Sequence, residues 1–250
     1  MGERADNRRF DLFVTGTDTG VGKTLIAAAL LHWFRDTGLK CAGYKPVSAG
    51  CERTRDGLRN DDALTLMQYA NVGIEYETVN PYAFEEPIAP HIAAAGDDVR
   101  IDLGRITDCF AQIQKQADLV VVEGAGGWFV PLGDEQPLTT LADVARTLGL
   151  PVLLVVGMRL GCLNHALLTV QAIRSARLEL TGWIANRIDP EFAHADENIA
   201  FLERQMPAPL LGIVPHEEKP APERVAALLE IERLNTMVRG DRMPDSDQAG

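Results

Sequence analysis

Short apolar runs alternate with helix-like segments along most of this chain. The runs typical of buried strands are residues 12–14, 40–47, 119–123, 152–156, 182–185 and 210–214. Apolar residues recur with helical spacing in residues 25–34, 61–69, 102–117, 141–148, 164–176 and 223–234. Strands separated by helices favour right-handed crossovers and a mostly parallel sheet. We therefore predict an α/β fold with one doubly wound sheet and helices on both faces.

The connecting segments carry their own signals. Asn60 precedes the 61–69 helix as a plausible N-cap. Residues 80–90 hold three prolines and predict an ordered loop, and residues 134–139 predict a surface loop. We expect a single domain over residues 1–238 and a disordered tail over 239–250, which is rich in Asp, Gly and Ser.

Composition narrows the classes of function. The 250 residues include 24 basic and 36 acidic side chains, so the net charge is −12 and a nucleic-acid partner is not expected. No apolar run approaches the roughly 18 residues of a membrane helix, and the first ten residues carry no secretory pattern. The four cysteines are scattered, which favours reduced thiols. These features predict a cytoplasmic protein without a membrane partner.

A phosphate-binding loop is predicted between the first strand and the first helix. The sequence GTDTGVGKT starts at Gly16, and its Lys23 and Thr24 suit a nucleotide β/γ-phosphate and Mg²⁺. The usual pattern has glycine five residues before Gly22, where this chain has Thr17. An ordinary glycine-rich turn is the alternative, but a Gly-Lys-Thr triplet at a strand–helix junction favours nucleotide binding.

Charged residues at other predicted strand ends extend this site. Glu123 ends the run LVVVE, so its carboxylate would face the crevice where open α/β sheets bind ligands. Asp62 is a second candidate metal ligand, although its place at a helix start also suits the helix dipole. Lys45 ends another predicted strand and could neutralise charge on a transferring phosphoryl group, or be an ordinary strand-end lysine.

Two further segments could contact substrates. The backbone of residues 161–164 precedes a helix and could bind a carboxylate, while capping by Asn164 is an equal alternative. Asn186 ends a strand and its amide could pair with a purine edge, although a lone Asn is more often a turn former.

Taken together, these motifs resemble the dethiobiotin synthetase family over nearly the whole chain. The matching segments, in order, are VTGTDTGVGKT, AGYKPV, LRNDDAL, VNPYAFEEPIAPH, VEGAGGW, LGCLNHA and PAPLLG. The resemblance implies a homodimeric ligase that uses Mg²⁺ and ATP to close the ureido ring of dethiobiotin from 7,8-diaminononanoate and CO₂. A carbamate and a carbamic–phosphoric anhydride are the implied intermediates.

The resemblance also assigns site residues. The implied catalytic pair is Lys45 with Lys23, and the implied Mg²⁺ ligands are Thr24, Asp62 and Glu123. The nucleotide would be contacted by Gly20, Val21, Gly22, Lys23, Thr24, Leu25, Asp62, Glu123, Gly124, Ala125, Gly126, Asn186, Arg187, Pro215, His216 and Glu217. The diamine would be contacted by Thr19, Ser48 and Ala49, and by Gly161, Cys162, Leu163 and Asn164 from a second subunit.

The chain departs from the family pattern at several positions. The family often reads Pro-Val-Ala-Ser-Gly after the catalytic lysine, with its Ser touching substrate, whereas Ser48 here precedes Ala49. Either Ser48 replaces that contact through a backbone shift or the contact is lost. Gly20 stands where relatives frequently carry an acid, and His216 and Glu217 replace apolar residues.

Three alternatives compete with this reading. A partner-switching ATPase of the division-site type usually has a second lysine early in the loop, where this chain has Thr17 and Asp18. Cobyrinate-type amidating ligases add a glutamine-hydrolysing domain for which this chain is too short. A catalytically inactive relative is disfavoured because Lys23, Lys45 and Glu123 are all present.

Overall fold

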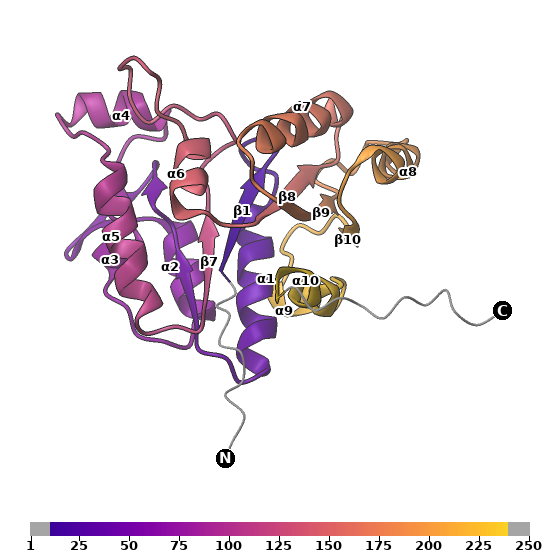
Figure 1. Ribbon diagram of the computed structural model, residues 1–250, viewed down its shortest axis with the longest axis horizontal. Helices are drawn as coiled ribbons and strands as arrows, with labels where there is room; N and C mark the ends of the chain where they lie inside the picture. Colours follow the sequence, from indigo (N-terminus) through magenta and orange to yellow (C-terminus); the bar gives the residue numbers. More distant parts are fainter. Residues whose placement is uncertain (1–10, 240–250) are drawn as a thin grey trace.

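The computed structural model describes residues 11–239 and is built on a six-stranded parallel sheet (Figure 1). Its strand order is β10-β9-β8-β1-β7-β2. The strands are β1 (Leu12–Gly16), β2 (Cys41–Tyr44), β7 (Leu119–Glu123), β8 (Val152–Gly157), β9 (Leu180–Asn186) and β10 (Leu210–Val214). Successive strands lie to one side of β1 and then to the other, so its carboxyl end marks the switch point of a doubly wound fold. The predicted fold class is therefore confirmed.

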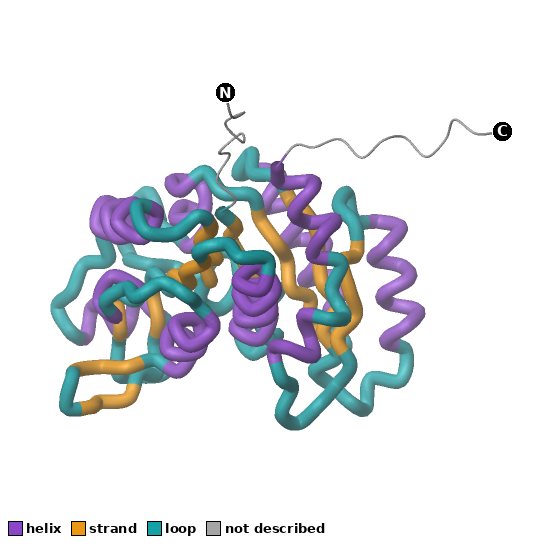
Figure 2. Tube along the Cα trace, turned by 90° about the horizontal axis from the view of Figure 1, so that it is seen from below, coloured by secondary structure: helices purple, strands orange, loops and turns teal. Residues whose placement is uncertain are grey.

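Helices cover both faces of this sheet, as Figure 2 shows. The main ones are α1 (Lys23–Asp36), α2 (Asp61–Tyr69), α5 (Leu103–Gln114), α6 (Leu141–Leu148), α7 (Cys162–Ser175), α8 (Ala195–Gln205), α9 (Pro222–Ala226) and α10 (Ile231–Arg239). Alternate residues of β7 enter different cores: Leu119 and Val121 pack with α1, and Val120 and Val122 pack with α5 and α6. Burial on both faces explains why β7 is a continuous apolar run.

Several shorter elements follow the carboxyl end of β2 in the chain. They are β3 (Val47–Ser48) paired with β6 (Tyr82–Ala83), the hairpin of β4 (Glu52–Thr54) and β5 (Gly57–Arg59), and the helices α3 (Tyr76–Val79) and α4 (Pro90–Gly96). The predicted loop over 80–90 thus contains the two-residue strand β6. The predicted surface loop over 134–139 is confirmed by its lack of helix or strand and its mostly exposed residues.

Two predicted elements are each divided in the structure. The single strand expected over 40–47 is divided, because Pro46 has no N–H and the Lys45 N–H donates to the Val79 carbonyl instead of a sheet neighbour. The helix expected over 223–234 is two helices, since the Glu230 N–H turns to the Leu211 carbonyl of β10. The tail predicted to be disordered lies outside the described residues from position 240 onward.

Two helix starts test the capping residues predicted from the sequence. Asn60 accepts a hydrogen bond from the Ala63 N–H at 3.3 Å, as predicted for the N-cap of α2. Helix α7 begins earlier than predicted, at Cys162, with Gly161 as its N-cap at φ 94°. The alternative in which Asn164 caps this helix is therefore wrong. Within residues 11–239 no helix is long and apolar enough to cross a membrane.

Candidate active site

The phosphate-binding loop connects β1 to α1 at the switch point of the sheet. Gly22 is the N-cap of α1 with φ 92°, a left-handed conformation that glycine adopts without strain. A Cβ on Gly16 would lie 2.5 Å from Cγ2 of Val21, so this glycine allows the loop to close on itself. The glycine displaced by one residue from the usual pattern therefore has a packing role. The N–H groups that start α1 point toward the carboxyl edge of the sheet, where an anion would bind.

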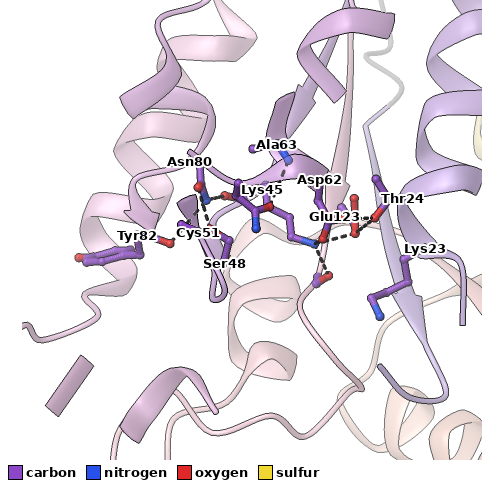
Figure 3. A network of polar contacts seen from close by, with 12 residues as sticks. Lys23, Thr24, Lys45, Ser48, Cys51, Asp62, Ala63, Asn80, Tyr82 and Glu123 are labelled. Atoms are coloured by element: carbon purple, nitrogen blue, oxygen red, sulfur yellow. Dashed lines mark hydrogen bonds and ion pairs between the residues drawn. The ribbon is translucent and has the colours of Figure 1, made fainter. Parts of the chain in front are cut away.

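Four polar side chains from different segments meet beside this loop (Figure 3). The Lys45 Nζ donates to Glu123 Oε1 at 2.6 Å and to Asp62 Oδ2 at 2.7 Å. The Thr24 hydroxyl lies 2.8 Å from both Asp62 Oδ1 and Glu123 Oε1. The predicted gathering of these groups is thus present in the fold, and Asp62 belongs to the cluster while Asn60 caps its helix.

Burial and charge act against each other in this cluster. Burial alone would lower the pKa of Lys45, but the Glu123 and Asp62 carboxylates raise it above its ordinary value. Burial raises the pKa of Glu123, and Lys45 opposes that shift. Burial lowers the pKa of Lys23 to about 8, with the Lys45 charge contributing in the same direction. Two buried ammonium groups facing the same loop favour an anionic ligand there.

The cluster lines a cavity of about 760 Å³. Sequence-predicted site residues in its wall are Thr19, Gly20, Gly22, Lys23, Thr24, Lys45, Ser48, Ala49, Asp62, Glu123, Ala125 and Gly126. A volume of this size suits a small-molecule ligand, and the wall combines ammonium, carboxylate and hydroxyl groups with apolar surface. The cavity joins the phosphate-binding loop to the segment that follows β2.

Other predicted contacts do not line this cavity in the described chain. Val21 belongs to the phosphate-binding loop, Leu25 follows it in α1 and Gly124 follows β7, while the segment 161–164 lies at the start of α7. The residues proposed for the purine end are Asn186, Arg187, Pro215, His216 and Glu217. They gather at the carboxyl ends of β9 and β10, where the Arg187 N–H donates to the Val214 carbonyl.

Two of the predicted ligand contacts, Asn186 and Ser48, already bind other residues of the chain. Asn186 is buried and its Nδ2 donates to the Val21 carbonyl at 2.8 Å, which ties the end of β9 to the phosphate-binding loop. A Cβ on Gly22 would lie only 2.2 Å from that nitrogen. The Ser48 hydroxyl donates to Asn80 Oδ1 at 2.7 Å. The contacts that these groups already make are therefore internal to the fold.

The cavity also contains residues that the sequence analysis did not assign to a ligand. They are Asn60, Pro87, Ile88, Ala89, Pro90, Val130 and Pro131. The prolines between 80 and 90 were predicted only as a loop, and nothing in their spacing places them over Lys45. The signal available was their apolar character in a loop, since exposed loops are usually polar.

Comparisons with known proteins identify relatives of this chain over most of its length. A family model described as AAA domain matches residues 11–224. The ATP-dependent dethiobiotin synthetase BioD of Pseudomonas paraeruginosa is 51% identical over 223 residues, covering 89% of this chain and 96% of that protein. The enzyme of the same name from Aromatoleum aromaticum is 52% identical over 219 residues, covering 88% and 96%.

A solved structure shares the fold at low identity. The MinC:MinD cell division protein complex of Aquifex aeolicus contains a chain that matches with a TM-score of 0.57 and 17% identity, covering 94% of this chain and 97% of that one. This likeness concerns the P-loop fold alone. The two synthetases are 51% and 52% identical to this chain over 89% and 88% of its length. This chain belongs to the ATP-dependent dethiobiotin synthetase family.

Proposed function

We propose that this protein converts 7,8-diaminononanoate, CO₂ and ATP to dethiobiotin, ADP and phosphate, in the cytoplasm. The observation that carries the proposal is the bonded cluster of Lys45, Asp62, Glu123 and Thr24 beside the phosphate-binding loop. It unites a nucleotide-phosphate site with a buried cation in one cavity. The names of the relatives supply ATP and the product, dethiobiotin.

The oxygen atoms of the cluster fit Mg²⁺. Thr24, Asp62 and Glu123 offer one hydroxyl and two carboxylates within hydrogen-bonding distance of each other, and hard oxygen ligands are those that Mg²⁺ prefers. Oε2 of Glu123 is buried without a hydrogen-bond partner among the described residues, so one ligand atom is uncommitted. These three side chains would hold the ion together with the ATP phosphates. The chemistry that Mg²⁺ supplies when bound is charge neutralisation on those phosphates.

The chain's lysines act on the reacting groups. One substrate amine adds to CO₂ and loses a proton, which gives a carbamate. A carbamate oxygen then attacks the γ-phosphorus, the bond to ADP breaks, and a carbamic–phosphoric anhydride forms. The second amine attacks the carbonyl carbon and gives up a proton, the C–O bond to phosphate breaks, and the ring closes with release of phosphate. Lys23 would hold the β/γ-phosphates while Lys45 stabilises charge on the carbamate and the transferring phosphoryl group.

A second subunit would complete the diamine site. Residues 161–164 begin α7, where backbone N–H groups suit a carboxylate, yet they do not line the cavity of their own described chain. Leu160 beside them is 89% exposed and Leu168 is 57% exposed. Apolar side chains of this size on one surface favour contact with another protein surface. We place residues 161–164 of one subunit against the cavity of the other in a homodimer.

The nucleotide base would lie toward the ends of β9 and β10. Asn186 joins that region to the phosphate-binding loop through the Val21 carbonyl, which leaves its amide oxygen for a purine amino group. Arg187 and residues 215–217 form the neighbouring surface. The His216 ring approaches the Arg187 carbonyl at 3.3 Å, so its position is linked to the same strand end.

Phosphate release from Mg·ATP and bicarbonate tests the proposal, with and without the diamine, while dethiobiotin is followed by mass. Release that requires the diamine and matches product formation supports the ligase. Hydrolysis that ignores the diamine would contradict it and favour the nucleotide-switch ATPase that shares the fold. Nucleotide binding without turnover would favour an inactive relative.

A further inference from the structure

A buried amide holds the main chain from which the Lys45 side chain extends. Asn80 is only 3% exposed, and its Nδ2 donates to the Lys45 carbonyl at 2.6 Å. The preceding residue, Val79, accepts a hydrogen bond from the Lys45 N–H at 2.9 Å. Both main-chain polar groups of Lys45 are therefore bound by neighbouring residues of one segment, and Figure 3 shows Asn80 beside Lys45.

This anchoring is needed because the sheet does not supply it. Strand β2 is at the edge of the sheet and ends at Tyr44. Pro46 follows Lys45 and has no N–H to donate. Lys45 therefore lies just past an edge strand, in a position where a chain would otherwise be free to move.

The same amide is connected to the helix that carries Asp62. Asn80 Oδ1 accepts hydrogen bonds from the Tyr76 hydroxyl at 2.9 Å and from the Ser48 hydroxyl at 2.7 Å. The Tyr76 oxygen in turn accepts the N–H of Asn60 at 2.7 Å, and Asn60 is the N-cap of α2. The chain of contacts from the Lys45 carbonyl to the start of α2 thus passes through Asn80 and Tyr76.

Only an amide fits this position. The side chain donates through nitrogen and accepts twice through oxygen, which a carboxylate, a hydroxyl or an alkyl group cannot do in the same shape. The result is a fixed relation between Lys45 and α2, whose Asp62 lies 2.7 Å from the Lys45 ammonium. An error of about 1 Å in the placement of a reacting group can cost about a hundredfold in rate.

We propose that Asn80 is a positioning residue that sets Lys45 relative to Asp62 for ring closure, with Tyr76 as its link to α2. The inference rests on the proposed function, since it concerns the step at which Lys45 acts. It predicts that loss of the Asn80 amide lowers kcat while nucleotide binding, which depends on the loop before α1, is retained.

The test compares Asn80→Ala, Tyr76→Phe and Tyr44→Phe in the full chain. Tyr44→Phe is the matched control, because it removes a buried 2.8 Å hydrogen bond to the Ile106 carbonyl without touching the network. Dethiobiotin formation gives kcat and KM, titration with Mg·ATP gives Kd, and thermal unfolding gives Tm for each variant. Tyr76→Phe keeps the ring and decides the question if Asn80→Ala fails to fold.

We expect kcat to fall about ten- to a hundredfold in Asn80→Ala and severalfold in Tyr76→Phe, with Kd for Mg·ATP within about twofold of wild type. Tyr44→Phe should lower Tm without this loss of kcat. If kcat follows Tm equally in all three variants, or stays at the wild-type value in Tyr76→Phe, the positioning role is overturned. Failure of the wild-type chain to form dethiobiotin would instead overturn the proposed function.

Discussion

The cavity beside the phosphate-binding loop and the start of α7 differ in how complete they are within one chain. In the cavity, Lys45, Asp62, Glu123 and Thr24 come from separate segments and bind each other directly. At the start of α7, residues 161–164 adjoin exposed leucines and do not line that cavity in the described chain. Under the proposed function, one chain holds the residues for phosphoryl transfer, whereas the carboxylate site would need a second copy.

Among the substitutions that test this comparison, Lys45→Ala should reduce the rate of ring closure the most. Removing the ammonium takes away the charge that faces the reacting groups, so we expect ring closure to slow by about a hundred- to a thousandfold. Binding of Mg·ATP should remain within a few-fold, because the loop and Lys23 are unchanged. Steady-state turnover and calorimetric nucleotide binding measure the two quantities.

Lys40→Ala is the control for Lys45→Ala, since Lys40 is an exposed lysine just before β2, the strand that Lys45 follows. It should leave both quantities unchanged. Circular dichroism checks that Lys45→Ala is folded, because loss of one partner leaves the buried Glu123 carboxylate uncompensated, at a cost of about 3–5 kcal/mol. An equal loss of ATP affinity and turnover would contradict the role assigned to Lys45.

Glu123→Gln should produce the second largest effect, a loss of Mg²⁺-dependent nucleotide binding. The amide keeps the size of the carboxylate but loses its charge, so we expect Mg²⁺-dependent nucleotide binding to weaken by at least about tenfold. Nucleotide binding is titrated with and without Mg²⁺, and chelation of the metal from the wild type should give a similar loss. Asp61→Asn, at an exposed acid beside Asp62, is the matched control. An unchanged Mg²⁺ titration would remove Glu123 from the metal site.

Local signals in the sequence predicted much of the cavity beside the phosphate-binding loop. The sheet, α2 with its Asn60 cap, and the convergence of Glu123 on the loop follow from buried strands and side-chain capping, which are local signals. The division of the strand at Pro46 also has a local cause, as does the turn at Arg55–Asp56, followed by Gly57 at φ 105°, that closes the unpredicted β4–β5 hairpin.

Local signals could not predict the hydrogen bonds between segments that are distant in the sequence. The network through Asn80 joins residues 45, 48, 60, 76 and 80. Tyr76 and Asn80 are one helical turn apart at α3, but their distance along the chain from residues 45, 48 and 60 follows no helical or strand period. Asn80 resembles an ordinary loop residue in the sequence, because its partners are set by the packing of the end of α3 against the chain that follows β2. The same holds for the prolines that line the cavity wall.

Asn164→Ala tests the incomplete side of the comparison. If the start of α7 receives the substrate carboxylate, the KM for the diamine should rise several-fold while the KM for ATP changes by less than about twofold. Initial rates at varied concentrations of each substrate separate the two. The reverse pattern would place Asn164 at the nucleotide.

Mixing subunits shows whether that contact crosses an interface. A dimer of one Lys45→Ala chain and one Asn164→Ala chain has one site with both residues intact, so a mixture should regain about a quarter of wild-type activity at low diamine. Each variant alone, under the same conditions, is the control. Activity that is only the average of the two variants would mean that both residues serve the site of their own chain.

Ala49→Ser should produce the smallest effect and addresses the order of two neighbouring residues in the cavity wall. The Ser48 hydroxyl is bound to Asn80 and lies 3.2 Å from the Cys51 sulfur, so it is held inside the fold. Position 49 also lines the cavity but presents only a methyl group. Ala49→Ser places a hydroxyl at the position where the family pattern has its Ser while Ser48 stays in place, and one added hydrogen bond of about 1 kcal/mol should lower the KM for the diamine about fivefold. Ala49→Val adds bulk without a hydroxyl and should raise that KM, so a fall in both variants would show that volume rather than hydrogen bonding decides the fit.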